Sequence, residues 1–292
     1  MLVIVGYVVV LGSVFGGYAL MGGHFGALYQ PLELLMIAGS AIGSFIVGND
    51  GHAIKATIKV LPKLFKSSKK RDKALYMELL ALLYLLLAKG RKDGMLALES
   101  DIDDPQNSPI FSPYPAILAD VRVMEFLTDY LRLIVSGNTD PFEIDQLMEH
   151  ELETYKHEAE APAHSLAKVG DALPALGIVA AVLGVVHALA SADLPPSVMG
   201  TLIAHAMVGT FLGVLLAYGF VSPLASLIEH KVSESLKVYQ CIKVTLMASL
   251  NGYAPQLAVE FGRKILRSTE RPSFTELDGH VRDVKSGKTT PT

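Results

Sequence analysis

The fold is decided by residues 172–228, which read ALPALGIVAAVLGVVHALASADLPPSVMGTLIAHAMVGTFLGVLLAYGFVSPLASLI. Asp193 is the one charged residue in this stretch, and Pro195-Pro196 beside it indicates a turn. A helix needs roughly 20 mostly apolar residues to cross a bilayer. The stretch therefore predicts two membrane spans, residues 172–190 and 200–222, joined by a short link.

The N-terminal part of the chain shows the same pattern. Residues 1–32 and 34–49 contain no Asp, Glu, Lys or Arg. Two more spans are therefore expected, at residues 2–21 and 31–48, with a turn at Gly22-Gly23. The predicted fold class is an all-α membrane protein with four transmembrane helices in two hairpins and a helical cytoplasmic domain between the second and third spans.

The basic residues predict the orientation of the chain. All 25 Lys and Arg fall within residues 55–168 or 231–288, and none falls in the links 22–30 and 191–199. Because Lys and Arg collect on the cytoplasmic side, both termini are expected to face the cytoplasm. The basic residues that follow the second span are expected to face membrane lipid, or to be only a topology signal. The first span lacks a basic n-region, so we expect a retained helix.

Composition divides the chain into four parts. They are a first hairpin, a cytoplasmic helical domain, a second hairpin, and a C-terminal helix with a flexible tail, at residues 1–49, 50–170, 171–223 and 224–292.

Helices outside the spans are predicted from apolar periodicity and from start and stop signals. The expected segments are residues 72–89, 94–101 and 113–135, and an acidic helix from Asp140 to Glu160, ended by Pro162. Leu79–Ala88 is too short to span and is expected to be a buried core helix. The last span is expected to continue to about Leu250, where Asn251-Gly252 is a typical stop. From about Gly279 onward the polar tail is expected to be disordered.

Small residues recur at four-residue spacing in all four spans. They are Gly12/Gly16, Gly39/Gly43, Gly209/Gly213 and Ala180/Gly184/Ala188. Such faces let helix backbones approach closely, within one chain or between copies. Their presence on every span favours a homo-oligomer.

Polar groups at membrane depth are costly and therefore informative. Thr210 is expected roughly mid-membrane, and His187 and His205 near the outer helix ends, where they have either a packing or a proton-relay role. Glu33 near the outer end of its span, or Asp171 at the inner end of its own, could flank an ion path, and Asp171 is also suited to favour the helix dipole at an N-terminus. Because no carboxylate is expected at mid-membrane, a conducting role implies a partner that supplies one.

Two prolines lie at the cytoplasmic ends of the third and fourth spans, Pro174 and Pro223. Each removes a backbone hydrogen bond, so the pair suggests either a hinge between membrane and cytoplasmic parts or the ends of the helices.

Signatures of enzymes are missing from the sequence. The HExxH-like string that begins at His150 has Thr154 in place of the second histidine, and we find no phosphate loop and no nucleophile elbow. The sequence therefore predicts no catalytic site, metal, cofactor or nucleic-acid partner. Cys241 is the only cysteine, which excludes an intrachain disulfide.

Long strings in the second hairpin resemble a known family. Residues 174–189 and 202–223 are similar to the third and fourth spans of the MotA family, stator subunits of the bacterial flagellar motor. The shorter strings GGY (16–18), GALYQP (26–31) and NGYAP (251–255) match it too. The likeness covers nearly the whole chain in order.

The resemblance implies a mechanism and a set of partners. MotA-type subunits form a ring in the inner membrane around a MotB-type partner anchored to peptidoglycan, and an aspartate of that partner carries the translocated ion. Pro174 and Pro223 would couple ion passage to conformational change. Arg91 and Glu99 would contact the rotor protein FliG, although from the residues alone they look like ordinary surface charges.

The resemblance also bears on the choice of ion. Sodium-driven relatives tend to carry a second hydroxyl on the third span, at a position that here is Ala181. Residues 173–190 contain neither Ser nor Thr. With Thr210 as the only hydroxyl on the expected path, protons are favoured over sodium.

Two other functions fit the sequence less well than a motor subunit does. The nearest is an ExbB/TolQ-like proton-channel energiser of outer-membrane processes, but such proteins resemble three-span chains. A secondary transporter would show polar, broken helices at the midplane, which are not evident here.

Overall fold

The computed structural model shows a chain built of helices. It describes residues 2–65, 72–137, 140–190 and 195–285, and no β-strand occurs among them. Two compact units are present. We call Met1–Ser68 with His157–Lys231 the membrane unit, and Lys69–Lys156 with Val232–Thr292 the extramembrane unit. The predicted four spans are confirmed, because four helices are long and apolar enough to cross a membrane.

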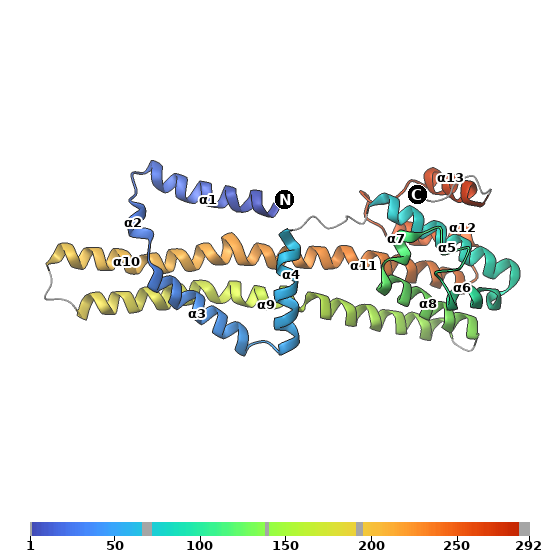
Figure 1. Cartoon of the computed structure of the whole chain (residues 1–292), viewed down its shortest axis with the longest axis horizontal. Coiled ribbons are helices and arrows are strands. Elements are labelled where there is room, and N and C mark those ends of the chain that lie inside the picture. Colours follow the sequence, from blue (N-terminus) through green and yellow to red (C-terminus); the bar gives the residue numbers. More distant parts are fainter. Residues whose placement is uncertain (1, 66–71, 138–139, 191–194, 286–292) are drawn as a thin grey trace. The chain divides into compact units, whose positions relative to one another are not determined.

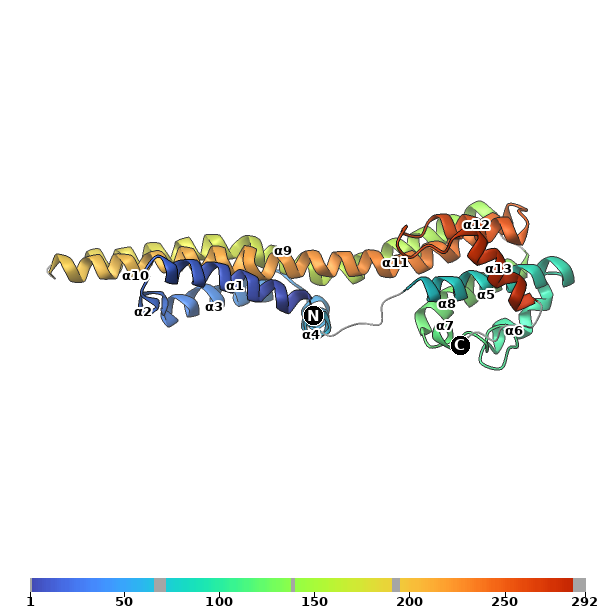
Figure 2. The same cartoon turned by 90° about the horizontal axis from the view of Figure 1, so that it is seen from above.

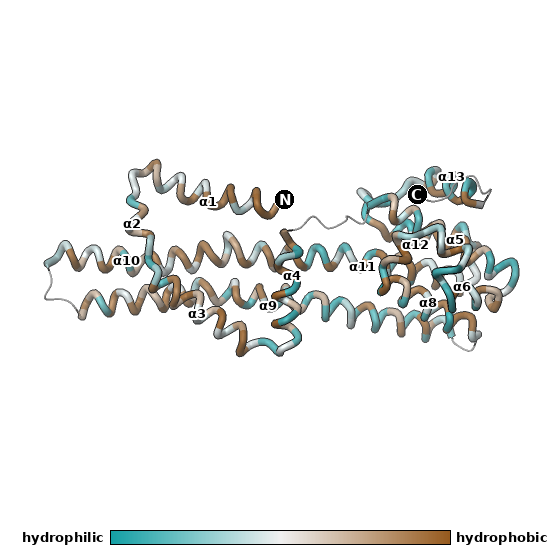
Figure 3. Tube along the Cα trace, viewed as in Figure 1, coloured by the Kyte–Doolittle hydropathy of each residue, from teal (hydrophilic) through white to brown (hydrophobic). Residues whose placement is uncertain are grey.

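Apolar helices make up the membrane unit. They are α1 (Leu2–Leu20), α2 (Phe25–Leu28), α3 (Pro31–Val47), the second half of α9 (Pro141–Ala190) and α10 (Pro196–Val214). The membrane halves of α9 and α10 run side by side (Figures 1 and 2). They are predominantly apolar, whereas the N-terminal half of α9 is mostly hydrophilic (Figure 3). The short α2, which follows the turn at Gly22, was not predicted.

Helix α9 is continuous over 50 residues and passes through both Pro162 and Pro174. The expected interruption at Pro162 is therefore wrong. A proline inside a helix removes one backbone hydrogen bond, but Pro162 and Ala163 are buried, so packing holds this part of the helix in place.

The fourth span continues without a break, as predicted. After α10 the chain forms the π-helix η2 (Leu215–Val221) and then α11 (Ser222–Leu250). The stop at Asn251-Gly252 is confirmed, because Gly252 has a φ of +86° and Tyr253 N–H donates to the Ala248 carbonyl.

Helix α4 (Gly51–Phe65) crosses the direction of the spans (Figures 1 and 2). Asp50 caps it by accepting a 2.7 Å hydrogen bond from Ala53 N–H. Ser165 on α9 donates a 2.5 Å hydrogen bond to Asn49, which ties the α3–α4 corner to α9. These contacts explain why residues 51–65 belong to the membrane unit, although composition places the limit of the spans near residue 50.

The core of the extramembrane unit surrounds α5 (Lys73–Asp93). Every residue of Leu79–Leu87 except Leu85 is buried, so the predicted core helix is confirmed. Helices η1 (Met95–Leu98) and α7 (Pro115–Leu118) pack on it, α6 (Glu99–Asp103) and α8 (Val121–Ser136) pack on η1, and residues 141–156 of α9 belong to the same unit. Cys241 on α11 is fully buried here, and burial raises the pKa of its thiol to about 12.

The C-terminal part of the chain is ordered further than expected. Helices α12 (Pro255–Lys264) and α13 (Phe274–Lys285) pack on α5, so the disorder expected from Gly279 is wrong as far as residue 285. The remaining tail, residues 286–292, lies outside the described residues. The buried Leu277 and Val281 give α13 an apolar face that composition alone did not reveal.

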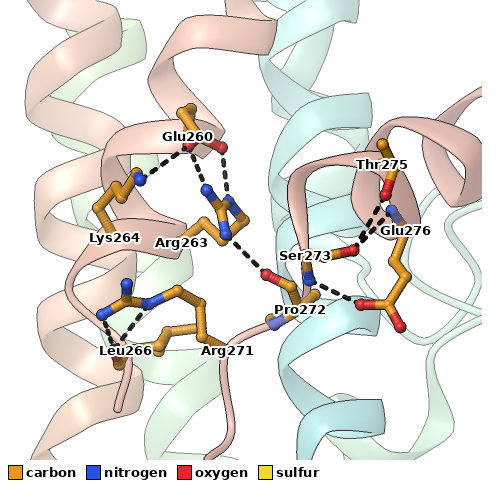
Figure 4. Close-up of polar contacts among 9 residues, drawn as sticks. All are labelled: Glu260, Arg263, Lys264, Leu266, Arg271, Pro272, Ser273, Thr275 and Glu276. Atoms are coloured by element: carbon orange, nitrogen blue, oxygen red, sulfur yellow. Dashed lines mark hydrogen bonds and ion pairs between the residues drawn. The ribbon is translucent and has the colours of Figure 1, made fainter. Parts of the chain in front are cut away.

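Polar contacts hold the α12–α13 connection (Figure 4). Ser273 and Glu276 form a capping box, in which each backbone N–H donates to the other side chain. The buried Arg263 donates to Glu260 and, at 2.7 Å, to the Pro272 carbonyl. The hydrogen bonds from Arg263 hold the pKa of Glu260 below its usual value.

Candidate functional site

Glycines bring the backbones of α9 and α10 into contact. A Cβ added at Gly213 would lie 2.6 Å from the Leu173 carbonyl oxygen and 2.9 Å from the Cα of Gly177. A Cβ at Gly177 would lie 2.7 Å from the Gly209 carbonyl oxygen. We call Gly177, Gly209 and Gly213 the glycine seam. This small-residue face is used within the chain, whereas a Cβ at Gly12, Gly16, Gly39 or Gly43 meets nothing within 4 Å among the described residues.

The two residues assigned to the ion path lie beside the seam. Thr210 follows Gly209, and Ala181 follows Ala180. A Cβ at Gly209 would lie 3.2 Å from the Cβ of Ala180, so the two residues share one level of the α9–α10 pair. Both are half-buried. The structure therefore brings Thr210 and Ala181 close together along the helix axes.

The Glu33 side chain is more fully enclosed between helices than the sequence suggested. It lies in the first turn of α3 and is 7% exposed. Its carboxyl group lies against Gly209 and Gly184, where a Cβ would be 3.1 Å from Oε2 and 3.7 Å from Oε1 respectively. Glu33 thus reaches the level of Gly209, which precedes Thr210, from the first turn of α3.

The remaining polar residues of the spans are less enclosed. Asp171 and His187 on α9 are exposed within the described chain, and His205 on α10 is half-buried. None of the three combines burial and an unpaired polar atom in the way that Glu33 does.

Pro174 and Pro223 lie at similar levels of the membrane unit. Ser222, which precedes Pro223, contacts Gly170, one helical turn before Pro174. The helix continues through each proline, so the interpretation of both as helix ends is wrong. Pro223 lies two residues after the end of the π-helix η2, whose wider turn accommodates the loss of the proline N–H donor. The π-helix was not predicted, and Pro223 was the only sequence signal for it.

Arg91 and Glu99 lie at the end of α5 and the beginning of α6. Both are exposed, and neither side chain makes an ion pair or hydrogen bond with another described residue. Asp101 has a different environment, because it is 3% exposed and accepts hydrogen bonds from Lys89 at 2.5 Å and Ser108 at 2.7 Å. Asp101 is thus buried and hydrogen-bonded, whereas Glu99, two residues earlier on the same helix, is exposed.

Family models match two parts of the chain. "Motility protein A N-terminal" matches residues 4–94, and "MotA/TolQ/ExbB proton channel family" matches residues 120–241. No group of three His, Cys, Asp or Glu that could hold a metal occurs among the described residues.

Similar proteins and structures agree with the models. Motility protein A of Salmonella typhimurium is 62% identical over 286 residues, covering 98% of this chain and 97% of the relative. Motility protein A of Escherichia coli K12 is 63% identical over 98% of this chain and 97% of the relative. The flagellar MotAB stator complex from Bacillus subtilis has a chain with a TM-score of 0.70 and 25% identity, covering 88% of this chain and 92% of that one.

The C. jejuni MotAB structure has the same fold, with a TM-score of 0.73, covering 93% of this chain and 98% of that chain. Four membrane-capable helices, the two family models and the near full-length relatives converge. The chain belongs to the motility protein A family, whose members are multi-pass inner-membrane subunits of the flagellar stator.

Proposed function

We propose that several copies of this chain surround a MotB-type partner and conduct protons with it, and that the flow drives torque on the rotor. The partner, anchored to peptidoglycan, supplies the carboxyl group that carries the ion through the middle of the membrane. The chain itself acts without a catalytic site. Each proton that crosses releases about 2.3 kcal/mol per 100 mV, which is the energy available for movement.

One observation supports this proposal most. Glu33, in the first turn of α3, is the one buried acid of the described spans, so the group that carries the ion across the rest of the membrane would have to come from a partner. The MotAB complexes with the same fold contain the kind of partner that would provide one. The open glycine faces of α1 and α3 leave surface for neighbouring copies.

Deletion of the gene tests the proposal. We expect paralysed cells that still carry normal filaments, because a stator is needed for rotation and not for filament assembly. Re-expression of the chain should restore swimming. Unchanged swimming in a strain shown to have no second stator set would contradict the proposal, as would a loss of filaments. An outer-membrane uptake defect in motile cells would instead favour the ExbB/TolQ-like function.

Protons are the proposed ion. Ala181 lacks the hydroxyl that would help replace the hydration shell of sodium, and Thr210 is the one hydroxyl at this level of the α9–α10 pair. Swimming should stop when the proton gradient is collapsed while a sodium gradient is kept. Swimming that persists under these conditions would show that sodium is the coupling ion.

Rotor contact is proposed for Arg91 and Glu99, with FliG as the partner. Their exposure and lack of intramolecular partners leave both side chains available. Because exposed ion pairs contribute about 0–1 kcal/mol each, Arg91→Ala or Glu99→Ala alone should reduce swimming only mildly. The double reversal Arg91→Glu with Glu99→Lys should reduce it strongly, because like charges would meet at both positions.

Lys92→Glu is the matched control for the rotor contact, since Lys92 is an exposed neighbour on the same helix. Swimming speed and stator level in the membrane would be measured for each variant. A control as defective as the double variant would mean that any charge reversal on this surface, and not a specific role of these two residues, impairs swimming.

Pro174 and Pro223 are proposed to couple proton passage to movement of the extramembrane unit. Their similar level and the π-helix before Pro223 support a hinge there. Pro223→Ala would restore a hydrogen-bond donor and should lower torque without lowering the stator level. Normal torque would contradict the proposed coupling.

The orientation proposed is that both termini and residues 50–170 and 224–292 face the cytoplasm, as the distribution of Lys and Arg suggests. Helix α4 would then lie at the inner membrane surface. Its exposed Lys55, Lys59 and Lys63 follow one row beside the exposed Ile58, an arrangement that suits contact with lipid headgroups and acyl chains. Accessibility of a single cysteine near either terminus in intact cells would test the orientation.

A further inference from the structure

Glu33 is the only buried residue of a charged type among the described residues of the membrane unit. It lies three residues into α3, after Pro31 and the exposed Leu32, so the α2 end of the membrane unit is close to its backbone. A carboxyl group at this depth is costly unless it has a function or a partner. The proposed function leaves Glu33 without a role.

The carboxyl group occupies a recess formed by two glycines on different helices. Gly209 on α10 and Gly184 on α9 both face it, with added Cβ atoms 3.1 Å from Oε2 and 3.7 Å from Oε1. Any larger residue at 209 would also meet Ala180 and Gly177. The carboxyl group therefore fits between the two helices because neither glycine has a side chain that would fill the space.

The environment of Oε2 favours a carboxyl group that carries a proton. The Gly209 backbone N–H interacts with the carboxyl group, but Oε2 is buried without a hydrogen-bond partner among the described residues. One backbone donor is less than a buried, ionised carboxylate needs, since each of its two oxygens accepts hydrogen bonds. A protonated oxygen can instead donate to a helix carbonyl, and the group can then release its proton when water or another carrier approaches.

Glu33 also adjoins the residues of the expected ion path. Gly209, which it contacts, precedes Thr210, and Ala180, which faces Gly209, precedes Ala181. Within residues 171–190 of α9 and in α10, the titratable side chains are Asp171, His187 and His205, and His24 precedes α2. None of these four is buried.

We propose that Glu33 is a second proton-exchanging group of the stator, at the α2 end of the path. It takes a proton from water at that face, which forms the carboxyl O–H bond, and passes it toward the Thr210 level, which returns the group to a carboxylate. The proton continues to water or to the partner's carboxyl group. This inference rests on the proposed function, because it assigns one step of the same proton path.

The test compares three variants in a strain that lacks the chromosomal gene: Glu33→Gln, Glu33→Asp and Glu33→Ala. Glutamine keeps size and polarity but cannot exchange a proton. We expect Glu33→Gln to lose most of the torque of tethered cells and the dependence of torque on external pH, at a normal stator level. Glu33→Asp should retain both in part. His187→Gln and His205→Gln are the controls, and each should keep the pH dependence.

Two outcomes would overturn the inference. If Glu33→Gln has the torque and pH profile of the unmodified chain, no proton exchange occurs at this position. If Glu33→Ala fails while Glu33→Gln works, the side chain only fills space. A deletion strain that still swims would instead contradict the proposed function. Failure of this inference and failure of the proposed function are therefore distinguishable.

A direct readout does not depend on torque. Infrared difference spectra of the purified full chain with its partner, titrated with external buffer, should contain a carboxyl C=O band that disappears in Glu33→Gln. Glu33→Asp should shift the band without removing it. A spectrum unchanged by Glu33→Gln would overturn the inference without any measurement of torque.

Discussion

Cells that carry Gly213→Val are expected to be paralysed. Even the first added carbon would lie 2.6 Å from the Leu173 carbonyl oxygen and 2.9 Å from the Cα of Gly177. Both are backbone atoms, which cannot rotate away, so α9 and α10 must separate. Overpacking of this kind costs about 1–3 kcal/mol in ordinary cores, and valine adds two more methyl groups. The separation would also open the level of Thr210 and Ala181.

Gly200→Val is the matched control. It introduces the same side chain into the same helix, at a glycine where a Cβ meets nothing within 4 Å. We expect this variant to swim and Gly213→Val to be non-motile, with stator levels in the membrane measured by immunoblot for both. Gly213→Ala should be intermediate. Normal swimming of Gly213→Val would mean that the two backbones do not approach as closely as described.

Gly213 and Gly12 belong to pairs with the same spacing but have different surroundings in the structure. All three G-x-x-x-G pairs have the same spacing, and sequence alone left contact within the chain and contact between copies equally open. The structure distinguishes one pair: Gly209 and Gly213 contact α9 inside the chain, whereas a Cβ added at Gly12 or Gly16 would have no neighbour within 4 Å among the described residues. Spacing identifies a face on which helices can approach, but it carries no information about which helix does so.

The spans could be predicted because lipid imposes a simple requirement on the sequence. A run of about 20 apolar residues has few alternatives to a spanning helix, so the four spans follow from hydropathy. The same reasoning failed where packing outweighs local preference. Pro162 was expected to end a helix and instead is buried within α9, and Gly279 was expected to begin a disordered tail and instead lies in α13.

Position in the fold, and not residue type, distinguishes the functional candidates. Glu33 looked like one of two charges flanking a path, and only the depth of its recess sets it apart from the exposed Asp171. Arg91 and Glu99 were identified only from the family resemblance, since no sequence pattern distinguishes a functional exposed charge from an ordinary one. The π-helix at Leu215–Val221 is a difference in backbone winding, for which hydropathy has no signal.

Asp101→Ala is expected to destabilise the extramembrane unit and to stop swimming. The Asp101 carboxylate accepts hydrogen bonds from Lys89 at 2.5 Å and from Ser108 at 2.7 Å. The Ser108 hydroxyl in turn accepts from the backbone N–H groups of Ile110 and Phe111. Removal of the carboxylate should cost about 2–3 kcal/mol, less than the 3–5 kcal/mol of a fully buried pair, because the Lys89 side chain is 29% exposed.

Asp103→Ala is the matched control, because it removes the same charge from the same helix at an exposed position. The Asp103 side chain is 65% exposed and pairs with Arg132 only at 3.5 Å. Its effect on stability should stay below about 1 kcal/mol. Thermal unfolding of the purified full chain should therefore shift clearly for Asp101→Ala and little for Asp103→Ala. Glu99→Ala should leave unfolding unchanged, since its side chain has no described partner, while it weakens rotor contact. Equal shifts for Asp101→Ala and Asp103→Ala would mean that the Lys89–Asp101–Ser108 network does not hold α6 in place. The network would then not be what positions Glu99, in the first turn of α6, either.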